Sequence, residues 1–248
     1  MRLLLKLRAN GNFTYNLSYH NKLRGLIYHS IEEDYPELHD KHTYKHFCFS
    51  NLFPLKIKNG EILPINDGEI KNLLISSPDK ILIKTLIENF PENINIGEMS
   101  FSLENIKLLS LFLNKNSKIT TATPIVMRIP SYNYEKYNIN SDKEYVYWRK
   151  QYSFSAFVKQ LEENLIKKYN VFHNTDIEEQ PLFSQFIFKK EICNHVTKDS
   201  KTYQVIGSIW EFPYNGLTKW QKKILSFGID CGFGEMNTSG FGFVNLIR

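Results

Sequence analysis

The chain has 248 residues and a mass of 29.2 kDa, and 42% of its residues are hydrophobic, enough to build one large domain or two small ones. Its net charge is +5, its pI is near 8.9, and 14% of its residues are aromatic. This composition suits a nucleic-acid-binding protein, because lysine and arginine neutralise phosphates and aromatic rings stack on unpaired bases. A core of Phe and Tyr beneath a lysine-rich surface explains the same figures equally simply.

The sequence argues against a membrane protein and against a disulfide-bonded secreted protein. The longest apolar stretch, residues 108–113, is far shorter than the ~20 residues that span a bilayer. Residues 1–8 interrupt their apolar side chains with charge, which predicts a first strand rather than a signal peptide. The three cysteines lie far apart and form no CxxC pair. We therefore expect a cytoplasmic protein with buried thiols and no membrane partner.

The first half of the chain is expected to follow the order β-α-β-β-α-β. Leu23, Leu26, Ile27 and Ile31 recur at helical spacing, and Ser77-Pro78-Asp79 is a good helix start. Turn residues at 59–60 and 67–68 separate two stretches rich in β-branched and aromatic residues. The expected strands cover residues 2–8, 46–58, 69–76 and 98–113, and the expected helices cover residues 18–33 and 78–90, the second with Ser77 as its N-cap.

The same order repeats in the second half, without residue-level similarity to the first. Thr218 to Gln221 form a capping box that opens a last helix, expected to end near Gly228. Two such units predict an α+β protein of two tandem ferredoxin-like domains, residues 1–118 and 119–248. Residues 130–150 are an insertion without an assignment. The expected strands cover residues 119–129, 183–196, 201–212 and 241–247, with a helix over residues 154–165 before the second of them.

A glycine-rich segment, residues 228–242, holds five of the twelve glycines. Such a density allows positive φ and a close approach of the backbone to a ligand, so that N–H groups could bind phosphate oxygens. The segment is neither a P-loop nor a dinucleotide-binding fingerprint, because no Gly-Lys-Ser/Thr follows and it lies between a helix and a strand. A tight turn before an edge strand explains the pattern equally well. The glycines concerned are Gly228, Gly232, Gly234, Gly240 and Gly242.

Five of the seven histidines lie between residues 20 and 46: His20, His29, His39, His42 and His46. The last three could converge on a metal ion, although no Cys or acidic residue completes a familiar zinc pattern. Scattered surface imidazoles are a second interpretation. We favour acid–base catalysis, because histidine accepts and donates a proton near neutral pH. We accordingly predict no metal site and no cofactor.

The chain resembles a known family at these motifs. Gly232-Phe-Gly234, five residues and then Gly240-Phe-Gly242 are similar to the C-terminal glycine-rich signature of the CRISPR repeat-processing endoribonucleases, in the repeat-associated mysterious protein superfamily. Gly25-Leu26-Ile27-Tyr28, the histidine-rich loop and the tandem-domain order extend the resemblance over nearly the whole chain. The resemblance implies a metal-independent endoribonuclease that cuts precursor RNA within CRISPR repeats to produce guide RNAs.

Such a cut uses the nucleophile that RNA itself carries. The 2′-OH attacks the adjacent phosphorus and leaves a 2′,3′-cyclic phosphate and a 5′-OH, with help from a base, an acid and a cation. The family's tyrosine–histidine–lysine set carries over to Tyr28, His39 and Lys45, and His42 is close enough to share or replace the role of His39. A tyrosine with a pKa near ~10 is a poor base, so Tyr28 is expected to position the 2′-OH.

Helical geometry places Tyr28 away from the apolar stripe of its helix, so we do not expect it in the core. Gly25 also lies on the polar side, where a missing side chain leaves room for a backbone or a phosphate. Basic residues in the second half could follow the RNA backbone, and tyrosines of the insertion could stack on bases. The expected RNA-binding residues are Gly232, Gly234, Gly240, Gly242, Arg128, Arg149, Lys150, Lys189, Lys190, Lys222 and Lys223.

CRISPR repeat RNA is therefore the expected partner, with interference-complex subunits and a second copy of the chain as further candidates. One rival hypothesis is a non-catalytic RNA-binding subunit of an interference complex that uses the histidine loop only for contacts. A metal-dependent nuclease and a structural protein without a nucleic-acid role are the others. RNA cleavage in excess chelator, with the product ends mapped, separates these hypotheses.

Overall fold

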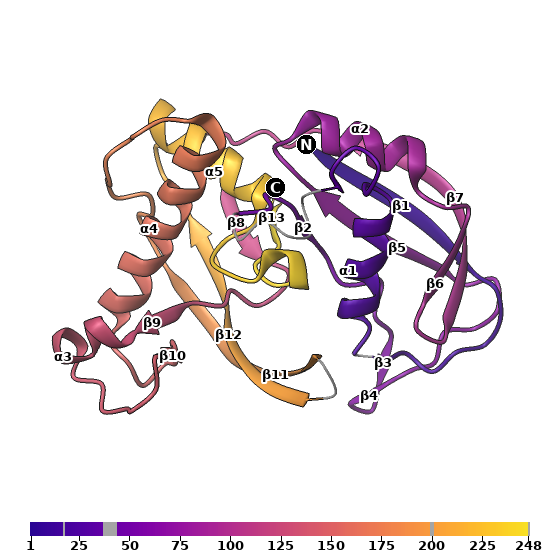
Figure 1. The fold of residues 1–248 in the computed structure, drawn as a ribbon, viewed down its shortest axis with the longest axis horizontal. Coiled ribbons are helices and arrows are strands. Elements are labelled where there is room, and N and C mark those ends of the chain that lie inside the picture. The colour runs from indigo at the N-terminus through magenta and orange to yellow at the C-terminus, as the bar shows by residue number, and fades with distance from the viewer. Residues whose placement is uncertain (17, 37–43, 199–200, 248) are drawn as a thin grey trace.

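The computed structural model describes residues 1–16, 18–36, 44–198 and 201–247, and two α/β units lie side by side in it (Figure 1). His39 and His42 lie outside the described residues. Within the described ranges, no helix combines the length and apolar character needed to cross a bilayer.

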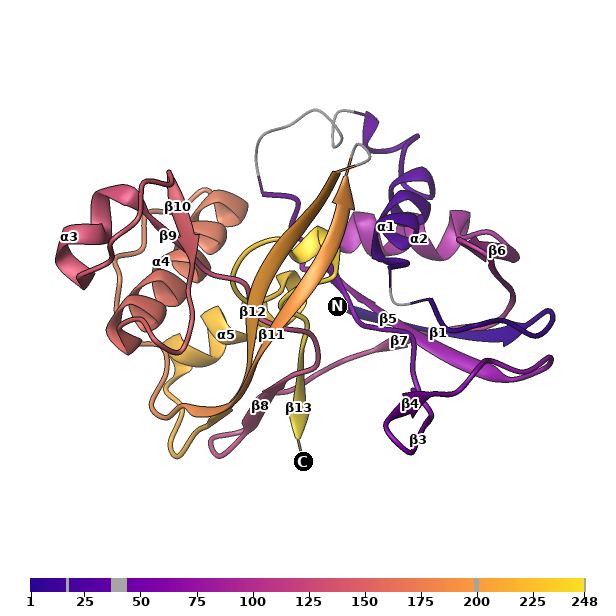
Figure 2. The ribbon, with the colours of Figure 1, turned by 90° about the horizontal axis from the view of Figure 1, so that it is seen from below.

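The N-terminal unit is an antiparallel five-stranded sheet in the order β2-β5-β1-β7-β6. Leu3, Leu5, Leu7 and Ala9 alternate along the first strand and are at most 2% exposed, because they face the helices that cover one side of the sheet (Figure 2). The strands are β1 (Arg2–Ala9), β2 (Cys48–Phe49), β5 (Ile70–Ser76), β6 (Asn93–Ile96) and β7 (Met99–Leu109), and the helices are α1 (His20–His29) and α2 (Lys80–Asn89).

The C-terminal unit is an antiparallel four-stranded sheet in the order β11-β12-β8-β13. Its order, and that of the N-terminal sheet apart from the additional edge strand β6, is second, third, first and fourth strand of a βαββαβ unit, so the predicted tandem ferredoxin-like fold is confirmed. The boundary between residues 118 and 119 stays a prediction. The elements are β8 (Lys118–Thr121), α4 (Phe154–His173), β11 (Ile187–Lys198), β12 (Lys201–Pro213), α5 (Lys219–Cys231), the short 3-10 helix η3 (Asn237–Ser239) and β13 (Val244–Ile247).

The start of α5 follows the sequence signal, whereas the start of α2 and the end of α5 do not. Thr218 forms the expected capping box. The cap of α2 is Asp79 in place of the predicted Ser77, because the Asp79 carboxylate accepts hydrogen bonds from the backbone N–H groups of Ile81 and Leu82. The predicted end of α5 near Gly228 is wrong, because the helix continues to Cys231. A Cβ on Gly228 would lie 2.8 Å from the Phe233 ring, so this glycine permits close packing inside the helix.

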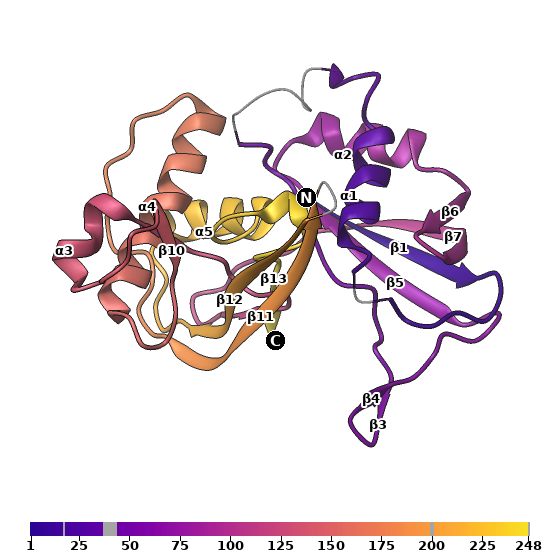
Figure 3. The same ribbon diagram turned by 60° about the horizontal axis from the view of Figure 1, so that its bottom comes forward.

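The predicted strand over residues 46–58 is also wrong in extent. Only β2 forms a strand of the sheet there, a single bridge joins Phe53 to Asn72 of β5, and Pro54, which has no N–H to donate, precedes a separate hairpin. That hairpin consists of β3 (Ile57–Lys58) and β4 (Glu61–Ile62) and projects away from the sheet (Figure 3). Asn59 and Gly60, which both have positive φ angles, form its turn.

The insertion, residues 130–150, contains structure that the sequence pattern left unassigned. It continues β9 (Arg128–Pro130) into η2 (Ser131–Asn133), α3 (Tyr134–Tyr137) and β10 (Tyr145–Tyr147). β9 and β10 pair as a two-stranded antiparallel sheet. The strand predicted over residues 119–129 is therefore divided between β8 and the start of this insertion.

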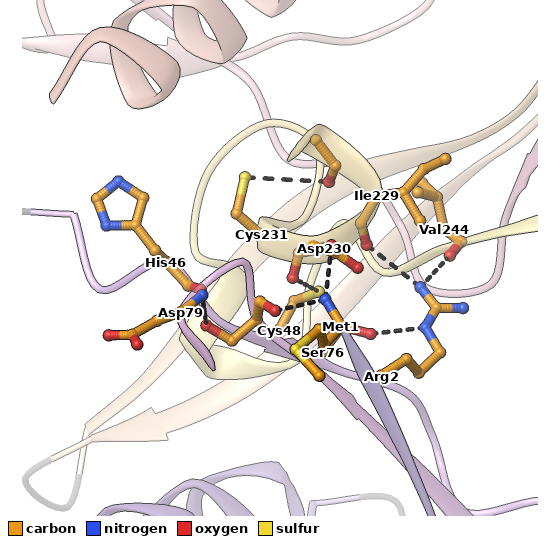
Figure 4. A network of polar contacts seen from close by, with 12 residues as sticks. Met1, Arg2, His46, Cys48, Ser76, Asp79, Ile229, Asp230, Cys231 and Val244 are labelled. Carbon is orange, nitrogen blue, oxygen red and sulfur yellow. Dashed lines mark hydrogen bonds and ion pairs between the residues drawn. The ribbon is translucent and has the colours of Figure 1, made fainter. Parts of the chain in front are cut away.

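A buried arginine joins the two domains (Figure 4). The Arg2 guanidinium donates to Ser76 Oγ at 2.6 Å in its own domain and to the Val244 carbonyl at 2.8 Å in the other. It also lies 4.2 Å from the centre of the Phe243 ring. Burial lowers the pKa of Arg2 to about 10, so the group stays charged at neutral pH. The hydrogen-bond partners of this one buried charge are thus divided between the two domains.

Candidate active site

A cleft of about 550 Å³ lies between the two domains. Residues 44–47 of the N-terminal domain, immediately after the histidine loop, form one wall. The opposite walls come from α4, the insertion and the glycine-rich segment, with Gln160, Asn164, Lys168, Tyr132, Tyr145, Glu235 and Thr238 among the lining residues. We call this the interdomain cleft.

Lys45 lines this cleft, and Tyr28 lies behind it, next to Lys45 and Thr238. Lys45 Nζ is 5.2 Å from the centre of the Tyr28 ring, within the range of a cation–π interaction. Lys45 lines the cleft directly, and the Tyr28 hydroxyl is hydrogen bonded to the side chain of Thr238, which also lines it. Two of the three residues that the resemblance assigned to catalysis are therefore neighbours.

The prediction that Tyr28 lies outside the core is wrong. Its side chain is 9% exposed and meets the Phe47 ring edge-on at a centroid distance of 5.6 Å. The helical wheel missed this because two segments distant in the sequence cover the flank of α1 that the sheet leaves open. One is the segment that follows the histidine loop, and the other is η3. Burial raises the pKa of Tyr28, although the Thr238 hydrogen bond and the Arg24 charge act in the opposite direction. Tyr28 is thus a neutral phenol at neutral pH.

The histidines are spread over different environments. His39 and His42 lie outside the described residues, so the structure does not place the third catalytic candidate. His29 is 82% exposed and pairs with Glu32, whereas His20 stacks on Tyr19 and contacts Asn51 Oδ1 at 2.8 Å. Within the described ranges, no three His, Cys, Asp or Glu side chains are grouped so that they could hold a metal ion.

His46 lies on the wall of the cleft and connects the two domains. Its Nε2 is 3.2 Å from the backbone carbonyl of Lys168, which can only accept, so Nε2 carries the proton. Burial lowers the pKa of His46 to about 4, and the positive charge of Lys168 acts in the same direction. The imidazole is therefore neutral at neutral pH.

Acidification is expected to destabilise the protein through His46. The unfolded chain binds a proton at this residue near pH 6.5 and the folded protein only near pH 4, so stability falls as the pH is lowered through this window. In His46→Gln, the loss of unfolding free energy between pH 7 and pH 4.5 should be smaller by about 1–2 kcal/mol. Urea denaturation at both pH values measures this, with the exposed His29→Gln as control. Equal pH dependence in wild type and His46→Gln would contradict the assignment.

The glycines of the C-terminal signature allow the chain to pack closely on itself. Gly232, Gly234, Gly240 and Gly242 all have φ between +67° and +89°. The backbone N–H groups of Gly232, Gly240 and Gly242 donate to the carbonyls of Gly228, Asn237 and Pro124. The tight-turn interpretation thus accounts for these three N–H groups, and the role of the signature in RNA binding stays a prediction.

A buried lysine holds this segment in place. Lys168 is 3% exposed, and its ammonium donates to the carbonyls of Gly232 and Gly234 and to Asn237 Oδ1, the last at 2.6 Å. Burial lowers its pKa. The sequence pattern missed this residue. Lys168 follows Leu161 and Leu165 by seven and three positions, and a lysine on the apolar face of a helix is the signal that could have found it.

Replacing Lys168 with methionine, which has a similar length and no charge, should destabilise the protein by about 2–4 kcal/mol. The change leaves the three oxygen acceptors in the interior without their donor. Denaturant unfolding measures the effect, and Lys167→Met, on the exposed side of the same turn, should change stability by less than about 0.5 kcal/mol. Equal stability of both variants would mean that the ammonium does not hold the segment.

The predicted basic RNA-binding residues lie at different places on the C-terminal domain. Arg128 lines the interdomain cleft, where it pairs with Glu235 and lies 4.9 Å from the centre of the Tyr145 ring. Arg149 borders a separate hollow beside β10, and Lys150 is exposed. Lys189 and Lys190 are exposed on β11, with Lys189 paired to Glu211, whereas Lys222 and Lys223 lie on α5. Their contacts with RNA stay predictions.

Comparison with known proteins identifies the family. Residues 106–246 match the family model described as CRISPR associated protein Cas6, C-terminal. The whole chain is 29% identical to CRISPR-associated endoribonuclease Cas6 2 of Methanocaldococcus jannaschii, which it covers completely. It is 30% identical over its whole length to CRISPR-associated endoribonuclease Cas6 of Haloferax mediterranei, of which it covers 94%. A solved structure titled CRISPR associated protein Cas6 shares the fold with a TM-score of 0.73 at 23% identity, covering 100% of this chain and 99% of that one.

The fold and the motifs define an α/β protein with two ferredoxin-like domains and a C-terminal glycine-rich segment. The chain belongs to the Cas6 family. The predicted family membership is thus confirmed.

Proposed function

We propose that this protein is an endoribonuclease that cleaves CRISPR precursor RNA within its repeats and so produces guide RNAs. The observation that carries the proposal is the position of Lys45 on the wall of the interdomain cleft, next to the Tyr28 ring, in a Cas6-family chain. Its relatives in M. jannaschii and H. mediterranei are named endoribonucleases. Repeat RNA is the proposed partner, while interference-complex subunits, a second copy and a cytoplasmic location stay predictions.

In the proposed mechanism the RNA supplies the nucleophile, and no metal ion takes part. The neutral phenol of Tyr28 donates a hydrogen bond that orients the 2′-OH, and its raised pKa keeps it protonated at neutral pH, so it does not serve as the base. His39, or His42 in its place, takes the proton from the 2′-OH as this oxygen attacks the phosphorus and returns a proton to the 5′ oxygen as the P–O5′ bond breaks. The Lys45 ammonium stabilises the negative charge that develops on the phosphate oxygens. The products are a 2′,3′-cyclic phosphate and a 5′-OH.

Incubation with the host's own repeat RNA in excess chelator tests this proposal. Cleavage at one site, with a cyclic phosphate on the upstream product and a 5′-OH on the downstream product, is the expected outcome. Dependence on an added divalent cation, or a 3′-OH product end, would contradict the metal-independent mechanism. Tight binding of intact RNA without any cleavage would instead favour the non-catalytic RNA-binding subunit.

A further inference from the structure

The wall of the interdomain cleft formed by α4 carries polar side chains that the proposed mechanism does not use. Gln160 and Asn164 are four residues apart on this helix, so their amides lie on one face, one turn above the other. Glu163 also lines the cleft, but it is already paired with Lys159 at 3.0 Å. The two amides are therefore the side chains on this face that are suited to recognise a neutral ligand edge.

Asn164 has an unsatisfied acceptor. Its Oδ1 is buried, and no residue in the part of the chain that the structure describes donates a hydrogen bond to it. Buried polar atoms are nearly always paired, so an unpaired one beside a cavity indicates a ligand that supplies the missing partner. An amide presents one acceptor and one donor side by side, the arrangement that recognises the edge of a nucleobase.

The other walls of the cleft supply aromatic surfaces. Tyr44 is 38% exposed and Tyr132 is 82% exposed, and both line the cleft. Tyr145 also lines it, with the Arg128 guanidinium 4.9 Å from the centre of its ring. Exposed tyrosine rings and arginine planes are the surfaces on which unpaired RNA bases stack. A volume of about 550 Å³ is within the range of small-ligand sites and admits a base with its ribose.

The charges in the cleft point to a base rather than to phosphates alone. The acidic residues Glu144, Glu163 and Glu235 line it together with the basic residues Lys45, Lys167, Lys168 and Arg128. A groove that only follows the RNA backbone carries predominantly positive charge. Carboxylates and amides next to cations instead suit a site in which a base edge is hydrogen bonded while its phosphate lies near Lys45.

We propose that the interdomain cleft binds one unpaired nucleobase of the RNA substrate, next to the phosphodiester that is cut, and that Asn164 and Gln160 recognise its edge. The inference rests on the proposed function for the identity of the ligand, and it adds the residues that select the sequence at the cut. Asn164 and Gln160 are specificity-determining residues here, with no part in proton transfer. Tyr44 and the tyrosines of the insertion provide the stacking surface.

The test uses repeat RNA in which the nucleotides on both sides of the cut are randomised. The full-length protein and its variants are incubated with this library, and the bound and cleaved RNAs are sequenced separately. Asn164→Leu removes one amide, and Gln160→Met removes the second amide at nearly constant length. The control is Asn89→Leu, the same substitution at the exposed end of α2. Thermal unfolding confirms that each variant is folded.

The wild type is expected to enrich one base at one position about tenfold or more in the bound RNA. In Asn164→Leu this enrichment should fall to within about twofold of random, in Gln160→Met it should decrease, and in Asn89→Leu it should persist. Unchanged enrichment in Asn164→Leu and Gln160→Met, or no enrichment in the wild type, would overturn the inference. The bound RNA decides this even if nothing is cleaved, whereas the absence of cleavage overturns the proposed function alone.

Discussion

Lys45→Ala is expected to lower kcat for repeat-RNA cleavage by about 10²- to 10³-fold while the Kd for RNA changes by less than about threefold. The Lys45 ammonium lies beside the Tyr28 ring on the wall of the interdomain cleft, where it can stabilise charge that exists only in the transition state. Single-turnover cleavage assays measure the chemical step, and filter binding measures the Kd.

Lys84→Ala, on the exposed face of α2, provides the matched control, because it removes the same charge where no RNA contact is expected. Its cleavage rate should equal that of the wild type. Parallel losses of rate and affinity in Lys45→Ala would mean that the residue only binds RNA. Since His39 and His42 lie outside the described residues, their alanine variants in the same assay identify which of them transfers the proton.

Gly242→Ala is expected to destabilise the protein by about 3–4 kcal/mol, the sum of an unfavourable positive φ and overpacking. Its φ is +68°, and a Cβ there would lie 1.9 Å from the Phe233 carbonyl oxygen, a distance too short for two non-bonded atoms. Because the clash is with backbone, the whole turn that closes the glycine-rich segment must move. Denaturant unfolding measures the loss, and a lower yield of folded protein is expected as well.

Gly97→Ala separates the two causes. Gly97 has nearly the same φ, +65°, but a Cβ added there meets no atom within 4 Å. It should therefore lose only about 1–2 kcal/mol, the cost of the backbone conformation. If both variants lose the same amount, the close approach to Phe233 does not govern the stability of the segment.

The fold was predictable where apolar periodicity and capping residues agree. The apolar stripe of α1 and the Thr218 capping box act within a few residues, so the sequence alone locates these helices. It locates α2 to within two residues, since Asp79 is the cap where Ser77 was predicted. The errors arise where tertiary contacts decide. Gly228 continues a helix because Phe233 and Leu165 pack against it, and the polar flank of α1 is buried by segments distant in the sequence.

The candidate site was predictable in part, and chiefly through family resemblance. Tyr28 and Lys45 were named from the sequence, and the structure places them side by side, although their catalytic roles stay predictions. Lys168, Thr238 and Asn164 were missed, because their significance depends on which groups they face across the cleft. A lysine among leucines was visible in the sequence, but its acceptors, the carbonyls of Gly232 and Gly234, were not.

The arginine that joins the domains has a consequence for how RNA enters. Any hinge motion of one domain against the other would break the hydrogen bond of Arg2 to the Val244 carbonyl and its contact with the Phe243 ring, which this guanidinium, 1% exposed, makes within the interface. Such a motion around the substrate is therefore energetically opposed. We expect the distance between the two walls of the cleft to stay constant on binding, so that the RNA changes its conformation to fit. Strands that unstack and turn out a base at low cost are then the preferred substrates.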